Sequence, residues 1–238
     1  MRAVFKRELQ AFFYSPIGYV FLSAFMFVMG LYFISDNMNV ESPHANFVSV
    51  LSSMTMIFII LVPILTMRLL SEERKNKSDQ LWMTAPVSIT SVVVGKFLAA
   101  VAVLAITLVF STVFPIILSL YGDPSGAEIL SGYFGFFLLG SMFISVGVWM
   151  SALTENQISS AIATFVVLLM MMLVDIVSTS ISNTLVAGIV GWLSAFSRFT
   201  DFNMGVLSLS TCIYYVSLTI FFIVMAVRTV EKRRWSEG

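Results

Sequence analysis

The chain has 238 residues, of which 58% are hydrophobic and 11% are charged, and its formal net charge at pH 7 is zero. A mean hydropathy of +0.96 excludes an ordinary soluble globular domain, in which about a quarter of the residues are charged. The composition therefore predicts a membrane protein, and we expect no nucleic-acid partner.

The first 15 residues combine charged and aromatic side chains. Between Val4 and Tyr14 the apolar residues fall on one half of a helical wheel and the polar residues on the other, with Glu8 as the exception. This pattern predicts an amphipathic helix over residues 1–15 that lies in the membrane interface and ends before Pro16. A disordered basic leader is the alternative interpretation.

Six long apolar runs follow, and each can cross a membrane, because about 20 helical residues span the hydrocarbon core. The predicted spans are Ile17–Ser35, Val48–Met67, Val92–Leu120, Gly132–Leu153, Ile158–Val177 and Leu207–Arg228. The third run is long enough to tilt or to begin as an interfacial helix. The predicted fold class is therefore all-α, a polytopic membrane protein with six transmembrane helices in a single domain over residues 1–238.

The basic residues predict the orientation of these spans. Of the 13 Lys and Arg residues, 12 precede the first span, lie between the second and third, or follow the sixth, and only Arg198 falls on the opposite side. Because Lys and Arg are enriched on the cytoplasmic side, we expect both termini and the loop between spans two and three in the cytoplasm. The protein is expected in the cell (cytoplasmic or inner) membrane.

Two prolines lie inside predicted spans. Pro63 in the second span and Pro115 in the third each remove a backbone hydrogen bond, so both are expected to kink their helices. Pro63 lies just before the loop between spans two and three, where a kink could act as a hinge.

The loop over residues 68–91 is strongly charged. A membrane protein can place such a cluster only in water or against another protein, so we expect a soluble partner to bind here. The charged residues are Glu72, Glu73, Arg74, Lys75, Lys77 and Asp79.

Spans four and five are joined by the short turn Thr154–Gln157, which makes them an antiparallel hairpin. The pairs Ser141/Ser145 and Gly147/Ser151 in span four have small-xxx-small spacing, which allows helices to approach one another closely.

The segment between spans five and six, residues 178–206, contains an apolar stretch, Thr184–Phe196. At about 13 residues this stretch is too short to cross comfortably, and a full span would carry the basic C-terminus outside. We expect re-entrant or interfacial helices on the external side, with Trp192 as an anchor. Asp175, near the outer end of span five, is either functional, as acidic residues at membrane depth usually are, or hydrated at the nearby interface.

The chain contains no GxxxxGK[ST], GxGxxG, CxxC or HExxH pattern. It therefore has no visible means of binding ATP, a dinucleotide or zinc. We expect no enzyme activity, no catalytic residue and no metal or cofactor in this chain.

The charged loop and the start of span three contain three motifs: RLLSEERK at 68–75, TAPVS at 84–88 and GKFLA at 95–99. Together they resemble the first cytoplasmic loop of ABC-2 type transporter permeases. The N-terminal stretches KREL and SPIGY and the turn at 154–157 are similar to the gliding-motility-associated subgroup. The resemblance covers essentially the whole chain, with one departure: KSDQ at 77–80 stands where many relatives have GTLE.

The resemblance implies a permease subunit of an ATP-driven ABC transporter, an exporter by family analogy, with ATP and magnesium bound by a separate ATPase subunit. A coupling helix around Ser71–Met83 would contact the ATPase, the turn at 154–157 would make a smaller contact, and residues 178–206 would form the external gate. The implied ATPase-coupling residues are Glu72, Glu73, Arg74, Lys75, Asp79, Leu81, Trp82, Glu155 and Asn156. The candidate gate or pathway residues are Pro63, Asp175 and Trp192.

A second six-span permease half, identical or different, is also implied as a partner, together with membrane lipid, and an accessory extracytoplasmic protein is a further candidate. The alternatives are a six-span scaffold that does not transport, an intramembrane enzyme acting on lipid, and a channel. The enzyme would need several His, Asp or Ser residues at one depth, and the channel a ring-forming filter motif. The sequence offers neither.

Overall fold

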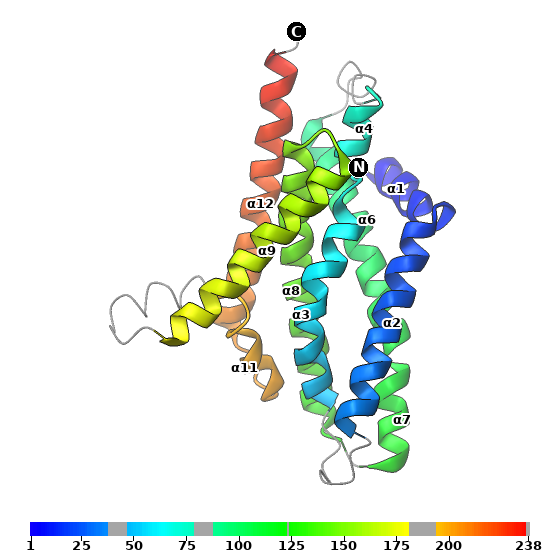
Figure 1. Ribbon diagram of the computed structural model, residues 1–238, viewed down its shortest axis with the longest axis vertical. Coiled ribbons are helices and arrows are strands. Elements are labelled where there is room, and N and C mark those ends of the chain that lie inside the picture. Colours follow the sequence, from blue (N-terminus) through cyan, green and yellow to red (C-terminus); the bar gives the residue numbers. More distant parts are fainter. Residues whose placement is uncertain (38–46, 79–87, 123, 181–193, 237–238) are drawn as a thin grey trace.

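The computed structural model describes residues 1–37, 47–78, 88–122, 124–180 and 194–236, and all regular structure in these ranges is helical. The helices, in chain order, are α1 (Arg2–Tyr14), α2 (Pro16–Asn37), α3 (Phe47–Thr66), α4 (Ser71–Lys75), α6 (Ile89–Ser111), α7 (Val113–Tyr121), α8 (Gly126–Leu153), α9 (Gln157–Ser180), α11 (Phe199–Asn203) and α12 (Leu209–Ser236). Six stretches have the length and apolarity of membrane spans, and Figure 1 shows them side by side. The predicted all-α, six-span fold is confirmed.

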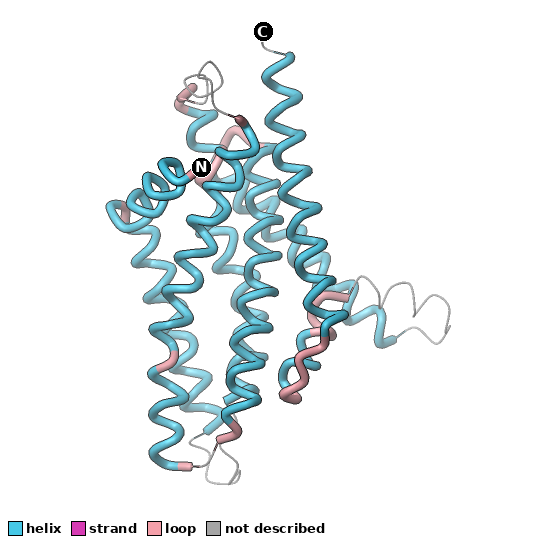
Figure 2. Tube along the Cα trace, turned by 180° about the vertical axis from the view of Figure 1, so that it is seen from behind, coloured by secondary structure: helices cyan, strands magenta, loops and turns pink. Residues whose placement is uncertain are grey.

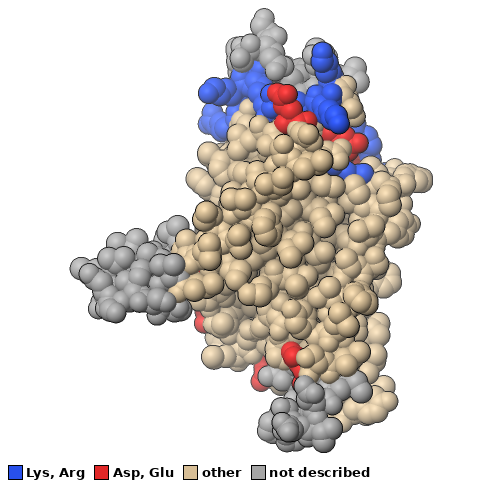
Figure 3. All heavy atoms as spheres, viewed as in Figure 1, with Lys and Arg blue, Asp and Glu red and all other residues tan. Residues whose placement is uncertain are grey.

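The two ends of the bundle differ in charge. The helices α1 and α4 and the last turns of α12 lie at one end, where both chain termini also lie (Figures 1 and 2). Lys and Arg gather at this end, whereas the middle of the face shown in Figure 3 is almost free of charged residues. We call this the charged end and the opposite one the far end.

The helix α8 is the centre of the bundle. It packs against α3, α6, α9, α11 and α12, and it is the most buried of the six spans. Its ring contacts with α3 centre on Phe58, whose centroid lies 5.0 Å from that of Phe136 and 6.3 Å from that of Phe143. Nearer the charged end α8 approaches α3 still more closely, because a Cβ atom at Gly147 would lie 2.2 Å from Oγ1 of Thr66. The close approach expected from small-residue spacing is confirmed there.

The two prolines inside the spans have different effects. Pro63 is buried within α3, and the helix continues through it to Thr66. Near Pro115 the third span is interrupted, since α6 ends at Ser111 and α7 begins at Val113. Pro115 has no N–H group to donate to the carbonyl four residues earlier, which is that of Ser111. The predicted kink is therefore a break between two helices, located one turn before the proline.

Three spans are longer than their apolar runs. The helix α8 begins at Gly126 rather than at Gly132, α9 continues to Ser180, and α12 continues to Ser236. Hydropathy marks only the part of a helix that lies in hydrocarbon, whereas a helix can continue into the polar interface without apolar side chains. The predicted spans were therefore shorter than the observed helices.

We expect Gly147→Ala to destabilise the bundle, because the added methyl group would overlap Thr66 and overpacking costs about 1–3 kcal/mol. Thermal unfolding of the purified protein in detergent measures the effect as a lower Tm. Gly126→Ala is the matched control, since nothing lies within 4 Å of a Cβ at Gly126. Equal Tm values for the two variants would contradict the close contact between α3 and α8.

Candidate functional site

The helix α4 is a single helical turn that begins on the side chain of Ser151 in α8. The Ser151 hydroxyl accepts hydrogen bonds from the backbone N–H groups of Leu70, at 3.0 Å, and Ser71, at 3.1 Å. It also donates to the carbonyl oxygen of Met67 at 3.3 Å. The first N–H groups of a helix have no partners within the helix, so this one hydroxyl both completes the start of α4 and attaches it to α8.

Of the helix predicted around Ser71–Met83, the structure describes residues 71–78, and within them α4 is shorter than predicted. The helix ends at Lys75, and Lys77 has a left-handed backbone with φ of 53°. The N–H of Ser78 donates to the carbonyl of Glu73 at 2.9 Å. A left-handed residue with such a backward bond is typical of a helix C-terminus, which explains why the helix does not continue beyond this turn.

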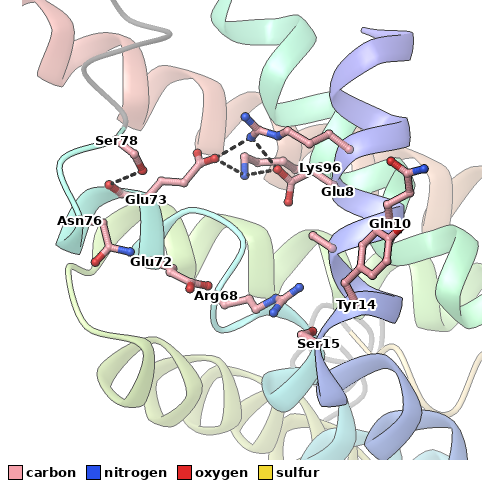
Figure 4. A pocket seen from close by; sticks show the side chains of 12 residues that line it. Glu8, Gln10, Tyr14, Ser15, Arg68, Glu72, Glu73, Asn76, Ser78 and Lys96 are labelled. Atoms are coloured by element: carbon pink, nitrogen blue, oxygen red, sulfur yellow. Dashed lines mark hydrogen bonds and ion pairs between the residues drawn. The ribbon is translucent and has the colours of Figure 1, made fainter.

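Four charged side chains connect α1, α4 and α6. The Lys96 Nζ atom of α6 lies 3.0 Å from Oε1 of both Glu8 and Glu73. The Arg7 Nη2 atom lies 2.7 Å from the same oxygen of Glu8 and 2.8 Å from that of Glu73. Two cations and two carboxylates thus alternate in a closed arrangement (Figure 4), which we call the four-charge network.

Most of the four-charge network is shielded from water. The side chain of Lys96 is 1% exposed, and those of Glu8 and Glu73 are 13% and 16% exposed, whereas Arg7 is 61% exposed. A buried charge is costly unless it is paired. The two carboxylates therefore compensate Lys96, and they do so from two different helices.

The four-charge network shifts the ionisation of its members on α1. Burial on its own would raise the pKa of the Glu8 carboxyl, but the charge of Lys96 and the hydrogen bonds from Arg7 and Lys96 outweigh burial, so the pKa lies below its usual value of 4.5. The hydrogen bond to Glu8 raises the pKa of the Arg7 guanidinium above its usual value. Both groups are therefore charged at neutral pH.

A second ion pair joins α4 to the turn between α8 and α9. The Arg74 guanidinium contacts the Glu155 carboxylate, whose side chain remains 69% exposed. Next to Glu155, the Asn156 side chain accepts a hydrogen bond from the N–H of Ile158 at 3.1 Å and so caps the start of α9. Lys75 is exposed on the same short helix as Arg74. The outer surface made by Lys75, Glu155 and Asn156 is called the docking face below.

A pocket of about 640 Å³ lies between α1 and the α3–α4 connection. The four-charge network lines it at one side, and Arg68 and Glu72 line it together with Gln10, Tyr14 and Ser15 of the α1 end (Figure 4). The pocket carries no set of metal ligands: within the ranges that the structure describes, no three His, Cys, Asp or Glu residues come close enough to hold a metal ion.

The predicted coupling residues thus separate into two groups. Glu73 and Arg74 have ionic partners inside the chain, and Glu72 is half-buried at the pocket. Lys75 and the two residues of the 154–157 turn face outward. Four further predicted site residues, Asp79, Leu81, Trp82 and Trp192, lie outside the described residues.

Sequence reasoning missed Ser151, Arg7, Glu8 and Lys96 as site residues. Glu8 gave a signal, because it lies on the apolar half of the α1 helical wheel. The structure explains this exception: α1 packs against α6, so that half of the helix faces protein, and Glu8 meets Lys96 there. The helix expected to lie in the interface is thus attached to the bundle by an ion pair.

Asp175 is buried, which contradicts the alternative in which it is simply hydrated at the interface. Its side chain is 8% exposed and accepts hydrogen bonds from the backbone N–H groups of Phe196, at 2.8 Å, and Ser197, at 3.1 Å, and from the hydroxyl of Ser194. These donors replace the water that a carboxylate would otherwise require. Asp175 therefore attaches the segment before α11 to α9.

The segment around α11 is also attached to the centre of the bundle. The Ser131 hydroxyl of α8 donates to the Phe202 carbonyl at 2.7 Å, and the Asn203 amide donates to the Ser52 hydroxyl of α3 at 2.6 Å. In Figure 1 the helices α9 and α12 end short of the far end, and α11 lies below them. Of the predicted element Thr184–Phe196, only the residues from 194 onward are described.

Comparison with known proteins adds one finding. A family model described as ABC-2 family transporter protein matches residues 2–231, a range that begins with α1 and ends within the last turns of α12. A search of curated proteins finds no match.

We expect Lys96→Met to destabilise the protein, because the variant leaves Glu8 and Glu73 without their buried counter-ion. Removing one partner of a buried ion pair costs about 3–5 kcal/mol, and the remaining contacts with Arg7 put the expected value at the lower end. Lys6→Met is the matched control, since Lys6 is exposed on α1 and should change stability by less than about 0.5 kcal/mol. Equal unfolding temperatures for both variants would contradict the role of the four-charge network.

Acidification should destabilise the protein through Glu8. Because the folded pKa of Glu8 lies below its usual value of 4.5, ionised Glu8 contributes stability that is fully present above this pH and is lost as the pH falls through the lowered pKa. Thermal unfolding measured between about pH 6 and pH 3 should show this loss. Glu8→Gln should flatten the acid side of the profile, and an unchanged profile would argue against the prediction.

Proposed function

The chain belongs to the ABC-2 family of transporter proteins, and from this premise we propose that it is a permease through which a separate ATPase subunit drives export. ATP and magnesium bind to that partner, and this chain converts the partner's movement into movement of its spans. The membership supports a transporter membrane subunit; the ATPase, the outward direction and the gliding-motility subgroup belong to the proposal.

The observation that carries the proposal is the ion pair between Arg74 and Glu155. It brings the loop after span two and the turn after span four together on one surface, although 80 residues separate them in the sequence. These are the two places at which the sequence predicted ATPase contacts. Because the Lys- and Arg-rich end of a membrane protein usually faces the cytoplasm, the docking face is on the side where an ATPase would meet it.

The attachments of α4 explain how a partner could act on the spans. Ser151 attaches α4 to α8, and the four-charge network attaches it to α6 and α1. A partner that moves α4 between two positions therefore applies force to three neighbouring helices at once. Coupling of this kind requires an element with two arrangements that the ligand-bound partner favours unequally, and we propose that α4 is this element.

At the opposite end, we propose that residues 178–206 act as the external gate. The support is the set of side chains from other helices that hold this segment: Asp175 binds its backbone before α11, and Ser131 and Ser52 bind α11 itself. An opening movement would exchange these hydrogen bonds for others. Trp192 and Pro63 remain candidate gate or pathway residues within this proposal.

We also propose a second permease half as a partner in the membrane. The spans α2 and α9 are the two least buried of the six. Large apolar side chains are exposed along α9 at intervals of about one helical turn, namely at Ile158, Ile162, Val166, Met170, Leu173 and Ile176. Such a stripe suits lipid or a second copy of the chain.

The test is co-purification of the chain with the ATPase encoded beside it, combined with measurement of ATP hydrolysis. We expect Lys75→Glu together with Asn156→Asp to reduce both the amount of bound ATPase and its stimulation by at least tenfold, because interface charges of the wrong sign cost several kcal/mol and about 1.4 kcal/mol is already a factor of ten. Neither residue belongs to the four-charge network, and Asp at position 156 can still accept the hydrogen bond that caps α9, so the Tm should not change.

The matched control is Lys232→Glu, which reverses an exposed charge at the same end of the bundle on α12. Reversal of Glu73 is unsuitable, because it would also disrupt the contact with Lys96. A well-folded chain that never retains an ATPase would refute the proposal and favour the scaffold alternative.

A further inference from the structure

The pocket between α1 and the α3–α4 connection is lined by two charged side chains that have no ion-pair partner among the described residues. Three cations and three carboxylates line it, and four of these six belong to the four-charge network. The remaining two are Arg68 and Glu72. Neither makes an ion pair with any residue in the described part of the chain, so the pocket offers one cation and one anion to a ligand.

The position of Arg68 is well defined even without an ionic partner. Its guanidinium carbon lies 5.1 Å from the centroid of the Phe12 ring, a cation–π contact that uses the face of the group. The N–H groups around its edge remain available, and they suit the oxygens of a phosphate. Figure 4 shows Arg68 extending towards Ser15, where α1 ends, with Tyr14 and Gln10 along the same side.

The pocket lies beside the ends of two apolar helices, α2 and α3. Tyr14 and Ser15 directly precede Pro16, where the first span begins, and Arg68 follows the end of α3 at Thr66 by two residues. The Tyr14 side chain is exposed, as is common for tyrosines at the membrane–water interface. The walls of the pocket therefore meet the membrane where phosphate groups are present.

We propose that this pocket binds the headgroup of a phospholipid that carries both a phosphate and a primary ammonium group, as phosphatidylethanolamine does. Arg68 holds the phosphate, with the Gln10 amide and the Tyr14 hydroxyl as further donors. Glu72, one helical turn further along the chain, accepts from the ammonium group. The bound lipid would fill the space between α1 and α4, which are otherwise joined only at the four-charge network among the contacts described here. The inference does not depend on the proposed ATPase.

The experiment is native mass spectrometry of the delipidated full-length chain with three lipids that have identical acyl chains. We expect phosphatidylethanolamine to bind about tenfold more tightly than phosphatidylcholine, whose methylated ammonium has no N–H to donate, and than phosphatidylglycerol, which has no cation. A tenfold ratio is typical of one charge-assisted hydrogen bond. Equal binding of the three lipids would overturn the proposal.

Two variants assign the contacts. Arg68→Gln should weaken binding of phosphatidylethanolamine and phosphatidylglycerol alike, since both lose the phosphate contact. Glu72→Gln should remove the preference for phosphatidylethanolamine over phosphatidylglycerol while leaving phosphate binding intact. Because Glu72 has no ionic partner among the described residues, this variant tests the proposal even if Arg68→Gln does not fold.

The control is Arg2→Gln, because Arg2 is exposed on α1 and lies outside the pocket. This variant should bind the lipids as the unmodified chain does. A preference unchanged by Glu72→Gln would refute the assignment.

Discussion

The buried amino group of Lys96 is the constraint on which the charged end of the molecule depends. An ammonium group that is shielded from water must have anions beside it. Both of its anions come from short helices at the charged end, Glu8 from α1 and Glu73 from α4. One buried cation therefore positions two surface helices relative to the third span. Since Ser151 attaches α4 to α8 as well, the charged end is a single connected unit.

This connected unit also separates residues that attach α4 from residues that are free to meet a partner. Within α4, Glu73 and Arg74 hold the helix in place, and Lys75 faces outward. Charge density alone would assign all of them to one interface. Their contacts show that some of them attach α4 to the bundle and that others face outward. Only substitutions of the outward-facing residues test docking without disturbing the fold.

The six spans were predictable because a membrane helix must be long and apolar enough to cross, and both properties can be read from a contiguous stretch of sequence. The location of charge at one end followed in the same way from the positions of Lys and Arg. The partners of Glu8 and Asp175 were not predictable, because periodicity places Glu8 on the apolar face of a helix without saying what that face meets. The sequence left the role of Asp175 open between function and hydration, because its donors, the N–H groups of Phe196 and Ser197, lie more than 20 residues later in the chain.

The sequence distance between Glu8 and Lys96, 88 residues, has a consequence for biosynthesis. At about 5–20 residues per second, Lys96 leaves the ribosome roughly 4–18 s after Glu8. During this interval the carboxylate of Glu8 has no buried cation to meet, and α1 has no docking site on α6. The first two spans must therefore enter the membrane before α1 can bind to α6. The position of one lysine along the chain thus determines the order in which the charged end assembles.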